Sequence, residues 1–519
     1  MTPGTLLRLA LAGTRADLAR VALTALSAAL ATLAGLAALT VLAIPTPLAT
    51  DGNQMRWSEQ YANQLLVEPG LRGGTAFALL LLTIPVLALA GQCARLGAPA
   101  RDRRLAALRL AGATPGQVSR VAMAEAGVAS LLGTLAGLGV YLAGHRLLHR
   151  PDARGRLPLP TDVYPSSVGM AALVLGLPVV AALATALMLR RVATTPFGVV
   201  RRVRTRGPWP WPGLLIILGL VAFAAIRPVT LWYDRRHAEL PPWLVPTLLV
   251  GGALLAMIGV VTGTGWVSHI TGRLLRRYAR RPAGLLASSR LMADPWMGSR
   301  TFAALLTALI FGAGAAMMTA HFRTRSAALA EDRRRFDEAV GQPHVPVAEA
   351  DDFYLRAMDL VHAAVVVALV IAALGLLVAV AENVVSRRRA YAALVAGGVP
   401  RGVLGRSLLW QAVTPAVPAI LVALTVGTLL VRGVFGGTVR TGGSSYSSCD
   451  AGPEICDNPA TAAQHTREIL VPAVERAVQV PADLLALYGA GALAAVLVTV
   501  GFGVLLLRSS TAVEELRTT

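Results

Sequence analysis

Long apolar runs alternate with short polar segments along nearly the whole chain. About ten of these runs reach the roughly 17–25 apolar residues that an α-helix needs to cross a bilayer core of ~30 Å. The runs lie at 21–44, 75–95, 122–145, 167–189, 213–230, 244–267, 301–320, 357–380, 408–431 and 482–507. The pattern therefore predicts an all-α, polytopic membrane protein with about ten transmembrane helices.

Composition agrees with a chain that is solvated mainly by lipid. Only 15% of the 519 residues are charged and 55% are hydrophobic, with a mean hydropathy of +0.61, whereas soluble domains carry about 25% charged residues. All 48 basic residues are arginines. A phosphate-binding loop requires a lysine, so we expect this chain to lack a nucleotide-binding site of its own.

The arginines are concentrated in four short loops, and this distribution predicts the orientation. The four loops are 95–120, 190–206, 273–300 and 387–406. Short loops rich in arginine stay in the cytoplasm, so we expect a multi-pass protein of the cytoplasmic membrane with both termini cytoplasmic. The net charge of +20 then reflects topology and contact with anionic lipid headgroups, and we expect no nucleic-acid partner.

One of these basic loops contains a segment that occurs twice in the chain. Residues 103–115 read RRLAALRLAGATP, and residues 388–400 read RRAYAALVAGGVP. Each copy is a basic amphipathic stretch of the kind that lies at a membrane interface, followed by a glycine break and a proline that suits the first turn of the next helix. The repetition predicts two parallel four-helix repeats joined by a helix pair, related by an axis along the membrane normal.

The expected domain boundaries follow from this 4+2+4 arrangement. We expect an interfacial N-terminal helix, a first repeat, a linking helix pair, and a second repeat with an interfacial lead-in helix and a cysteine-containing outer loop. These correspond to residues 1–20, 21–205, 206–270 and 271–519.

The first copy of the segment, with Ala124-Glu125-Ala126 after it, resembles the signature of the FtsX-like permeases of ABC transporters. Residues 194–201 and 511–517 resemble the corresponding exits from the last span of each domain. The second copy is more distant, since Leu394 stands where the first has Arg109. The layout resembles MacB and Bce-type permeases without their large ectodomain, because the loops 45–74 and 321–355 are short.

The resemblance implies a permease driven by a separate ATPase, which binds ATP and Mg²⁺ and docks on the cytoplasmic segments in two copies. The implied docking residues are Arg103, Arg104, Leu108, Gly112, Pro115, Arg388, Arg389, Gly397 and Pro400. ATPase closure would then move the helices by mechanotransmission. The expected output is export or outer-leaflet extraction of an amphipathic substrate, such as a lipid, a lipopeptide or an antimicrobial peptide.

Three alternatives to a transporter subunit remain to be weighed. A membrane sensor or scaffold would regulate a kinase or an extracytoplasmic partner without moving a substrate. A secondary carrier would need a carboxylate near the midplane, whereas Glu125 and Glu382 fall close to the ends of their predicted spans. An autonomous enzyme is disfavoured because the sequence shows no nucleophile–base pair and no metal-ligand constellation.

The longest outer loop, 433–481, raises two further expectations. Cys449 and Cys456 lie in it, and an extracytoplasmic location favours a disulfide between them. Its stretch 442–448 is expected to be flexible, and 461–478 to be helical. We expect His145, His321 and His362 to be interfacial residues at helix ends, with no metal site.

Overall fold

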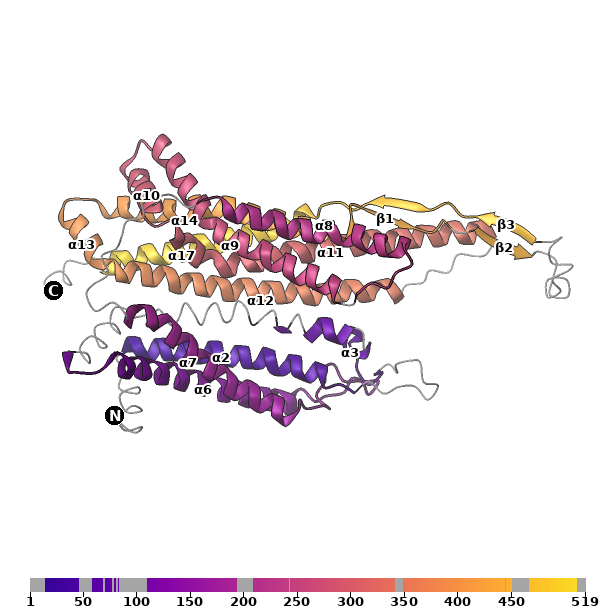
Figure 1. The fold of residues 1–519 in the computed structure, drawn as a ribbon, viewed down its shortest axis with the longest axis horizontal. Coiled ribbons are helices and arrows are strands. Elements are labelled where there is room, and N and C mark those ends of the chain that lie inside the picture. The colour runs from indigo at the N-terminus through magenta and orange to yellow at the C-terminus, as the bar shows by residue number, and fades with distance from the viewer. Residues whose placement is uncertain are drawn as a thin grey trace.

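The computed structural model describes residues 15–45, 58–68, 71–76, 79–80, 83, 110–193, 209–241, 243–340, 349–443, 445–449 and 466–510. Within these ranges, nine helices are long and apolar enough to cross a membrane, and they correspond to nine of the predicted spans. The remaining predicted span, 75–95, falls largely outside the described residues. The long helices lie roughly along one axis (Figure 1), as expected for an all-α polytopic membrane protein.

The first bundle comprises α2 (Arg15–Leu42), α3 (Gln64–Val67), α6 (Pro115–Leu147) and α7 (Ser167–Ala193). Helix α6 packs along both α2 and α7. Two glycines one turn apart make the closest approach to α2: a Cβ on Gly133 would lie 2.1 Å from the Ala25 carbonyl oxygen, and one on Gly137 would lie 2.7 Å from that of Ala29. Small residues at this spacing let two helix backbones touch within lipid.

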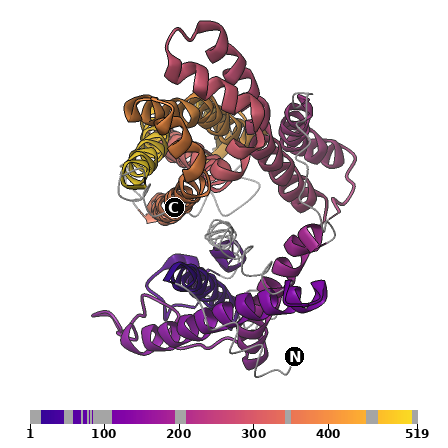
Figure 2. The ribbon, with the colours of Figure 1, turned by 90° about the vertical axis from the view of Figure 1, so that its left-hand side faces the viewer.

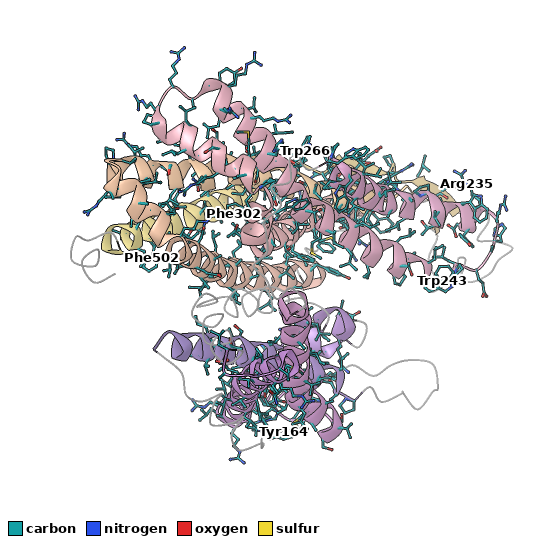
Figure 3. The ribbon with its side chains drawn as sticks, turned by 60° about the vertical axis from the view of Figure 1, so that its left-hand side comes forward. Tyr164, Arg235, Trp243, Trp266, Phe302 and Phe502 are labelled. Atoms are coloured by element: carbon teal, nitrogen blue, oxygen red, sulfur yellow. The ribbon has the colours of Figure 1, made fainter. Side chains whose placement is uncertain are left out.

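The linking pair consists of α8 (Trp211–Arg235) and α9 (Leu244–Tyr278). A Cβ on Gly219 would lie 2.6 Å from the Gly252 carbonyl oxygen, so these two helices are also in close backbone contact. The pair packs against α11 and α14 of the second bundle, and Figure 2 shows it on one flank of that bundle. Arg235 and Trp243 lie at the tip of the pair (Figure 3), where Trp243 is 63% exposed, as suits an interfacial anchor.

The second bundle comprises α10 (Pro282–Ala293), α11 (Trp296–Val340), α12 (Glu349–Ser386), α13 (Arg388–Ala396), α14 (Arg401–Phe435) and α17 (Ala482–Ser510). Helix α11 contacts α9, α12, α14 and α17. Its residues Leu305, Leu306 and Leu309 are fully buried in the largest apolar core of the described chain. The two bundles meet through a small apolar contact between Ala31 of α2 and Ile371 of α12.

Helix α11 continues far beyond its predicted span. Its 45 residues correspond to roughly 68 Å at 1.5 Å per residue, more than twice the ~30 Å of a bilayer core. Most of the predicted loop 321–355 is therefore helical, in α11 and at the start of α12. The extension is polar and carries an ion pair between Glu331 and Arg335, four residues apart, and Glu331 also accepts a hydrogen bond of 2.6 Å from Arg476 Nη2.

Four strands follow α14 at this end of the molecule. They are β1 (Thr438–Thr441), β2 (Ser445–Cys449), β3 (Thr466–Leu470) and β4 (Val474–Ala477). Two of them, β1 and β4, pack against the extension. β1 pairs antiparallel with β4, placing Val439 opposite Arg476, and β2 pairs antiparallel with β3. Val439 and Val474 are buried against Met317 and Ala328 of α11. The helix predicted over 461–478 is therefore wrong for β3 and β4, because pairing with β1 and β2 satisfies the backbone in extended form.

The two ends of the molecule differ in structure. We call the end that carries α10 and α13 the α13 end, and the end that carries the four strands the strand end (Figure 1). At the strand end, the loops of the first bundle are held together by polar contacts. Tyr61 donates a hydrogen bond of 2.7 Å to Asp162, and Ala62 N–H donates one of 2.9 Å to the Leu157 carbonyl. Nearby, the Arg72 side chain is 4% exposed.

Candidate coupling site

The first copy of the repeated segment forms a capped turn at the start of α6. Gly112 has φ +88°, in the left-handed region that favours glycine. Thr114 is the N-cap: its hydroxyl accepts from the Gln117 amide at 3.3 Å, while Gln117 Oε1 accepts from the Thr114 amide at 3.0 Å. Pro115 is the first helical residue, where its missing N–H costs nothing. The local sequence thus specifies a fixed change of direction followed at once by a long helix.

The second copy forms a similar turn between α13 and α14. The amides of Gly397 and Gly398 donate back to carbonyls of α13, each at 3.0 Å, and the Val399 amide donates to the Leu394 carbonyl at 3.0 Å. Gly398 has φ +86°, and Pro400 is the N-cap of α14. Both turns lie at the α13 end of the molecule (Figure 1).

The two turns differ in which glycine adopts the left-handed backbone conformation. Alignment of the two sequences pairs Gly112 with Gly397, and Gly397 was the residue selected by sequence. The structure instead gives the left-handed conformation to Gly398, while Gly397 has φ −77°. Because two glycines are adjacent in the second copy, either of them can adopt the positive φ, and the sequence shows this pair.

Several predicted docking residues fall outside the described structure. Arg103, Arg104 and Leu108 lie in the range 84–109, which is not described. Arg388 and Arg389 open α13, but their side chains are not among those described. The described docking residues are therefore the turn positions of both copies.

A shallow apolar groove borders the second turn, and sequence reasoning missed it. It is lined by Pro282, Leu285, Leu286, Gly397, Gly398, Val399, Pro400 and Val403. One face of α10 is buried against α9 and α14 through Ala283, Ala287 and Leu291, and this leaves Leu285 46% exposed at the groove. The four-residue spacing of the buried positions was visible in the sequence, but the partner helices were not.

A buried tyrosine anchors α13 to α10. Tyr391 is 1% exposed, and its hydroxyl accepts a hydrogen bond of 2.6 Å from Arg290 Nη1. The Arg290 guanidinium also lies 4.6 Å from the centre of the Tyr391 ring, a cation–π distance. The short helix before the second turn is therefore held by a specific contact as well as by its backbone.

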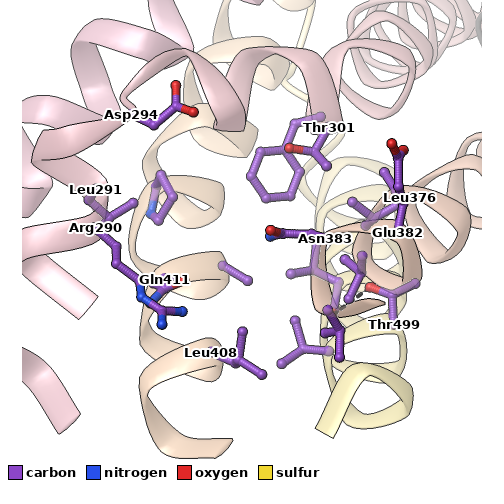
Figure 4. A pocket seen from close by; sticks show the side chains of 18 of the residues that line it. Arg290, Leu291, Asp294, Thr301, Leu376, Glu382, Asn383, Leu408, Gln411 and Thr499 are labelled. Atoms are coloured by element: carbon purple, nitrogen blue, oxygen red, sulfur yellow. Dashed lines mark hydrogen bonds between the residues drawn. The ribbon is translucent and has the colours of Figure 1, made fainter. Parts of the chain in front are cut away.

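A polar cavity of about 280 Å³ lies behind α13, inside the second bundle. Its polar lining residues are Arg290, Asp294, Thr301, Glu382, Asn383, Arg387, Gln411 and Thr499. Figure 4 shows Arg290 and Gln411 on one side, with Asn383, Glu382 and Thr499 on the other. Glu382, expected at a helix end, lies near the end of α12 and lines this cavity.

Other predicted positions are scattered over the described structure. Cys449 ends β2, but Cys456 is not described, so the disulfide stays a prediction. His145 is 7% exposed and hydrogen-bonds to the Val163 carbonyl at 3.1 Å. His362 hydrogen-bonds to Thr319 on α11 at 2.9 Å and to a tyrosine on α17, so it links three helices inside the second bundle.

The described residues contain no group of three or more His, Cys, Asp or Glu side chains arranged to hold a metal ion. The family model described as FtsX-like permease C-terminal matches residues 75–197 and 363–514, together just over half of the chain. A search of curated proteins and a search of solved structures each gave no match.

The two matched regions each contain one copy of the repeated turn, so the duplication inferred from sequence corresponds to tandem FtsX-like domains. Permeases of this family are non-catalytic membrane subunits of ABC transporters and normally partner with an ABC ATPase. The nine membrane-length helices of the described ranges agree with such a subunit. The chain therefore belongs to the FtsX-like permease family and has a permease-type role in an ABC transporter.

Proposed function

We propose that the two turns at the α13 end are the docking points for a cytoplasmic ABC ATPase, with two copies per chain. Both turns belong to arginine-rich loops, which supports a cytoplasmic location for this end. The apolar groove beside Gly398 and Pro400 adds a recognition surface, because exposed Leu285 would be covered by a docked partner. ATP and Mg²⁺ are bound by that partner.

The observation that carries this proposal is the position of the turns at the starts of long helices. Helix α14 starts directly after Pro400 and continues for 35 residues, and α6 starts at Pro115 and continues for 33. A helix of 35 residues spans roughly 52 Å. A displacement applied at the turn is therefore delivered to the strand end, where α14 leads into β1. This is mechanotransmission along single helices.

The output we propose is export or outer-leaflet extraction of an amphipathic substrate, such as a lipid, lipopeptide or antimicrobial peptide. An alternative output is regulation of an extracytoplasmic partner or a kinase, and the α11 extension with its strands offers a surface for one. Substrate movement coupled to ATP hydrolysis in reconstituted vesicles supports the first. Stimulated ATP hydrolysis without movement of any such substrate supports the second.

The docking proposal is tested by purifying the tagged chain from native membranes in mild detergent and identifying the proteins that accompany it. We expect an ABC ATPase, lost on charge reversal of Arg388 and Arg389 and reduced by Leu285→Glu. The matched control is Leu159→Glu in a loop at the strand end, since Leu159 is also 46% exposed. Retention of the ATPase by the Leu285 variant would remove the groove from the proposal, and absence of an ATPase throughout would overturn docking.

A further inference from the structure

The polar cavity behind α13 is lined by side chains that offer more hydrogen-bond donors than the neighbouring residues accept. Each arginine guanidinium offers five N–H donors. Arg290 uses one of them, to Tyr391, and Arg387 lines the same cavity with its side chain partly exposed. Gln411 Nε2 is buried and has no hydrogen-bond partner in the described part of the chain. A buried donor normally has an acceptor, so Gln411 Nε2 points to a ligand, and the partly exposed guanidinium groups of Arg290 and Arg387 line the same cavity.

The remaining lining restricts what that ligand can be. Thr499 is 3% exposed, and its hydroxyl already donates to the Val496 carbonyl at 2.9 Å. The carboxylates of Asp294 and Glu382 have interactions of their own. In Figure 4 Glu382 lies across the cavity from Arg290, and the Asp294 carboxylate lies above Arg290 on the same side, away from its guanidinium. An anion is therefore favoured near Arg290 and Gln411, where positive charge and amide donors are combined.

The size and the location of the cavity favour one class of anion, a phosphate group. The cavity of about 280 Å³ is close to the lower end of the roughly 300–1,000 Å³ range of small-ligand sites. It lies between helix ends that carry Arg290 and Arg387, and arginines beside spanning helices attract anionic headgroups. Arginine forks match phosphate oxygens in a bidentate manner. Leu376 and Leu408 complete the lining with apolar surface.

We propose that this cavity is a binding site for a phosphate ester, held by Arg290, Arg387 and Gln411. The source of the phosphate is either the headgroup of an anionic phospholipid or a soluble phosphate compound. The site is separate from the docking turns, and its occupancy would fix Arg290, which in turn holds Tyr391 of α13. Binding itself does not depend on whether an ATPase docks there.

The test measures binding to the full, delipidated chain in detergent. One arm titrates phosphatidylglycerol and follows the first bound lipid by native mass spectrometry, with phosphatidylcholine for comparison. The other arm measures inorganic phosphate and glycerol 3-phosphate by equilibrium dialysis. We expect Arg387→Gln to weaken binding in one arm by roughly tenfold or more, because a charged hydrogen-bonding group is lost, and Gln411→Glu to weaken it further through repulsion.

The matched control is Arg406→Gln, which removes the same charge from an exposed position on α14 outside the cavity. It should leave the affinity of the first bound phosphate within about twofold of the unchanged chain. Melting temperatures of all variants separate loss of binding from loss of folding, and Arg387→Lys should bind with intermediate affinity. Equal binding by the Arg387, Gln411 and Arg406 variants in both arms would overturn the proposal, as would absence of binding to the unchanged chain.

Discussion

Replacing Arg72 by alanine should loosen the strand end of the first bundle more than any other single arginine change there. The side chain is 4% exposed, and it donates to five acceptors over 2.6–3.3 Å. These acceptors are the carbonyls of Ile44, Pro45, Leu66 and Val67 and the hydroxyl of Ser58. One guanidinium therefore joins the end of α2 to the loop that contains α3.

The magnitude follows from the acceptors that the alanine variant leaves behind. A buried polar group without its partner costs about 1–3 kcal/mol, and a hydrogen bond to a charged group contributes about 1.5–3 kcal/mol. Since water can reach part of the vacated space, we expect about 3 kcal/mol. That free energy corresponds to an increase on the order of 100-fold in the local opening constant.

Hydrogen–deuterium exchange measures this opening directly. The amides of Ser58 and Ala62 are protected by bonds to the Val67 and Leu157 carbonyls, and their exchange should accelerate in the Arg72→Ala variant. The control is Arg154→Ala, an exposed arginine in the neighbouring loop. If both variants exchange at the same rate in 58–68, the guanidinium is not what holds this loop, and the argument fails.

Three further outcomes are expected. Gly427→Val should lower the melting temperature, because a Cβ there would lie 2.3 Å from a backbone oxygen of α11, whereas Gly491→Val, with open space around it, should not. Burial and the hydrogen bond to Asp162 raise the pKa of Tyr61. The free energy that its neutral hydroxyl contributes to folding is therefore complete below the unfolded-state pKa of about 10 and is lost as pH rises through the folded-state pKa. The melting temperature, followed from pH 8 to 11, should fall less steeply for Tyr61→Phe than for the unchanged chain. His362→Leu should cost about 2 kcal/mol by removing two hydrogen bonds between helices, and a melting temperature equal to that of the unchanged chain would contradict this.

Hydropathy was sufficient to predict the membrane helices, because lipid requires every backbone group of a spanning segment to be satisfied within a helix. The predicted span 482–507 coincides with the one observed, Ala482–Leu507. Outside the bilayer this constraint disappears. The α11 extension has mixed charges and no apolar run, so hydropathy does not predict it, and contacts with distant strands, such as the bond from Arg476 to Glu331, are not visible in the local sequence.

The turns were predictable in kind but not in detail. In both copies, glycine followed by proline predicted that one helix ends and the next begins, and both turns have that form. Which glycine adopts positive φ was not predictable, because Gly397 and Gly398 are equally able to do so. The cavity was likewise not predictable from the sequence, since Arg387, just beyond α12, and Gln411 of α14 come to line one cavity through the packing of α12 and α14 against α17.

Within the described residues, α8 and α9 pack on the second bundle, and this makes the two repeats unequal. These helices cover a flank of α11 and α14, whereas α7 of the first bundle has most of its surface exposed. On one side of the second repeat, a hydrophobic molecule diffusing in the bilayer would contact α8 and α9 instead of α11 and α14. On the first repeat it would contact α7 directly. Within the described part of the chain, the two repeats therefore present unequal surfaces to the surrounding lipid.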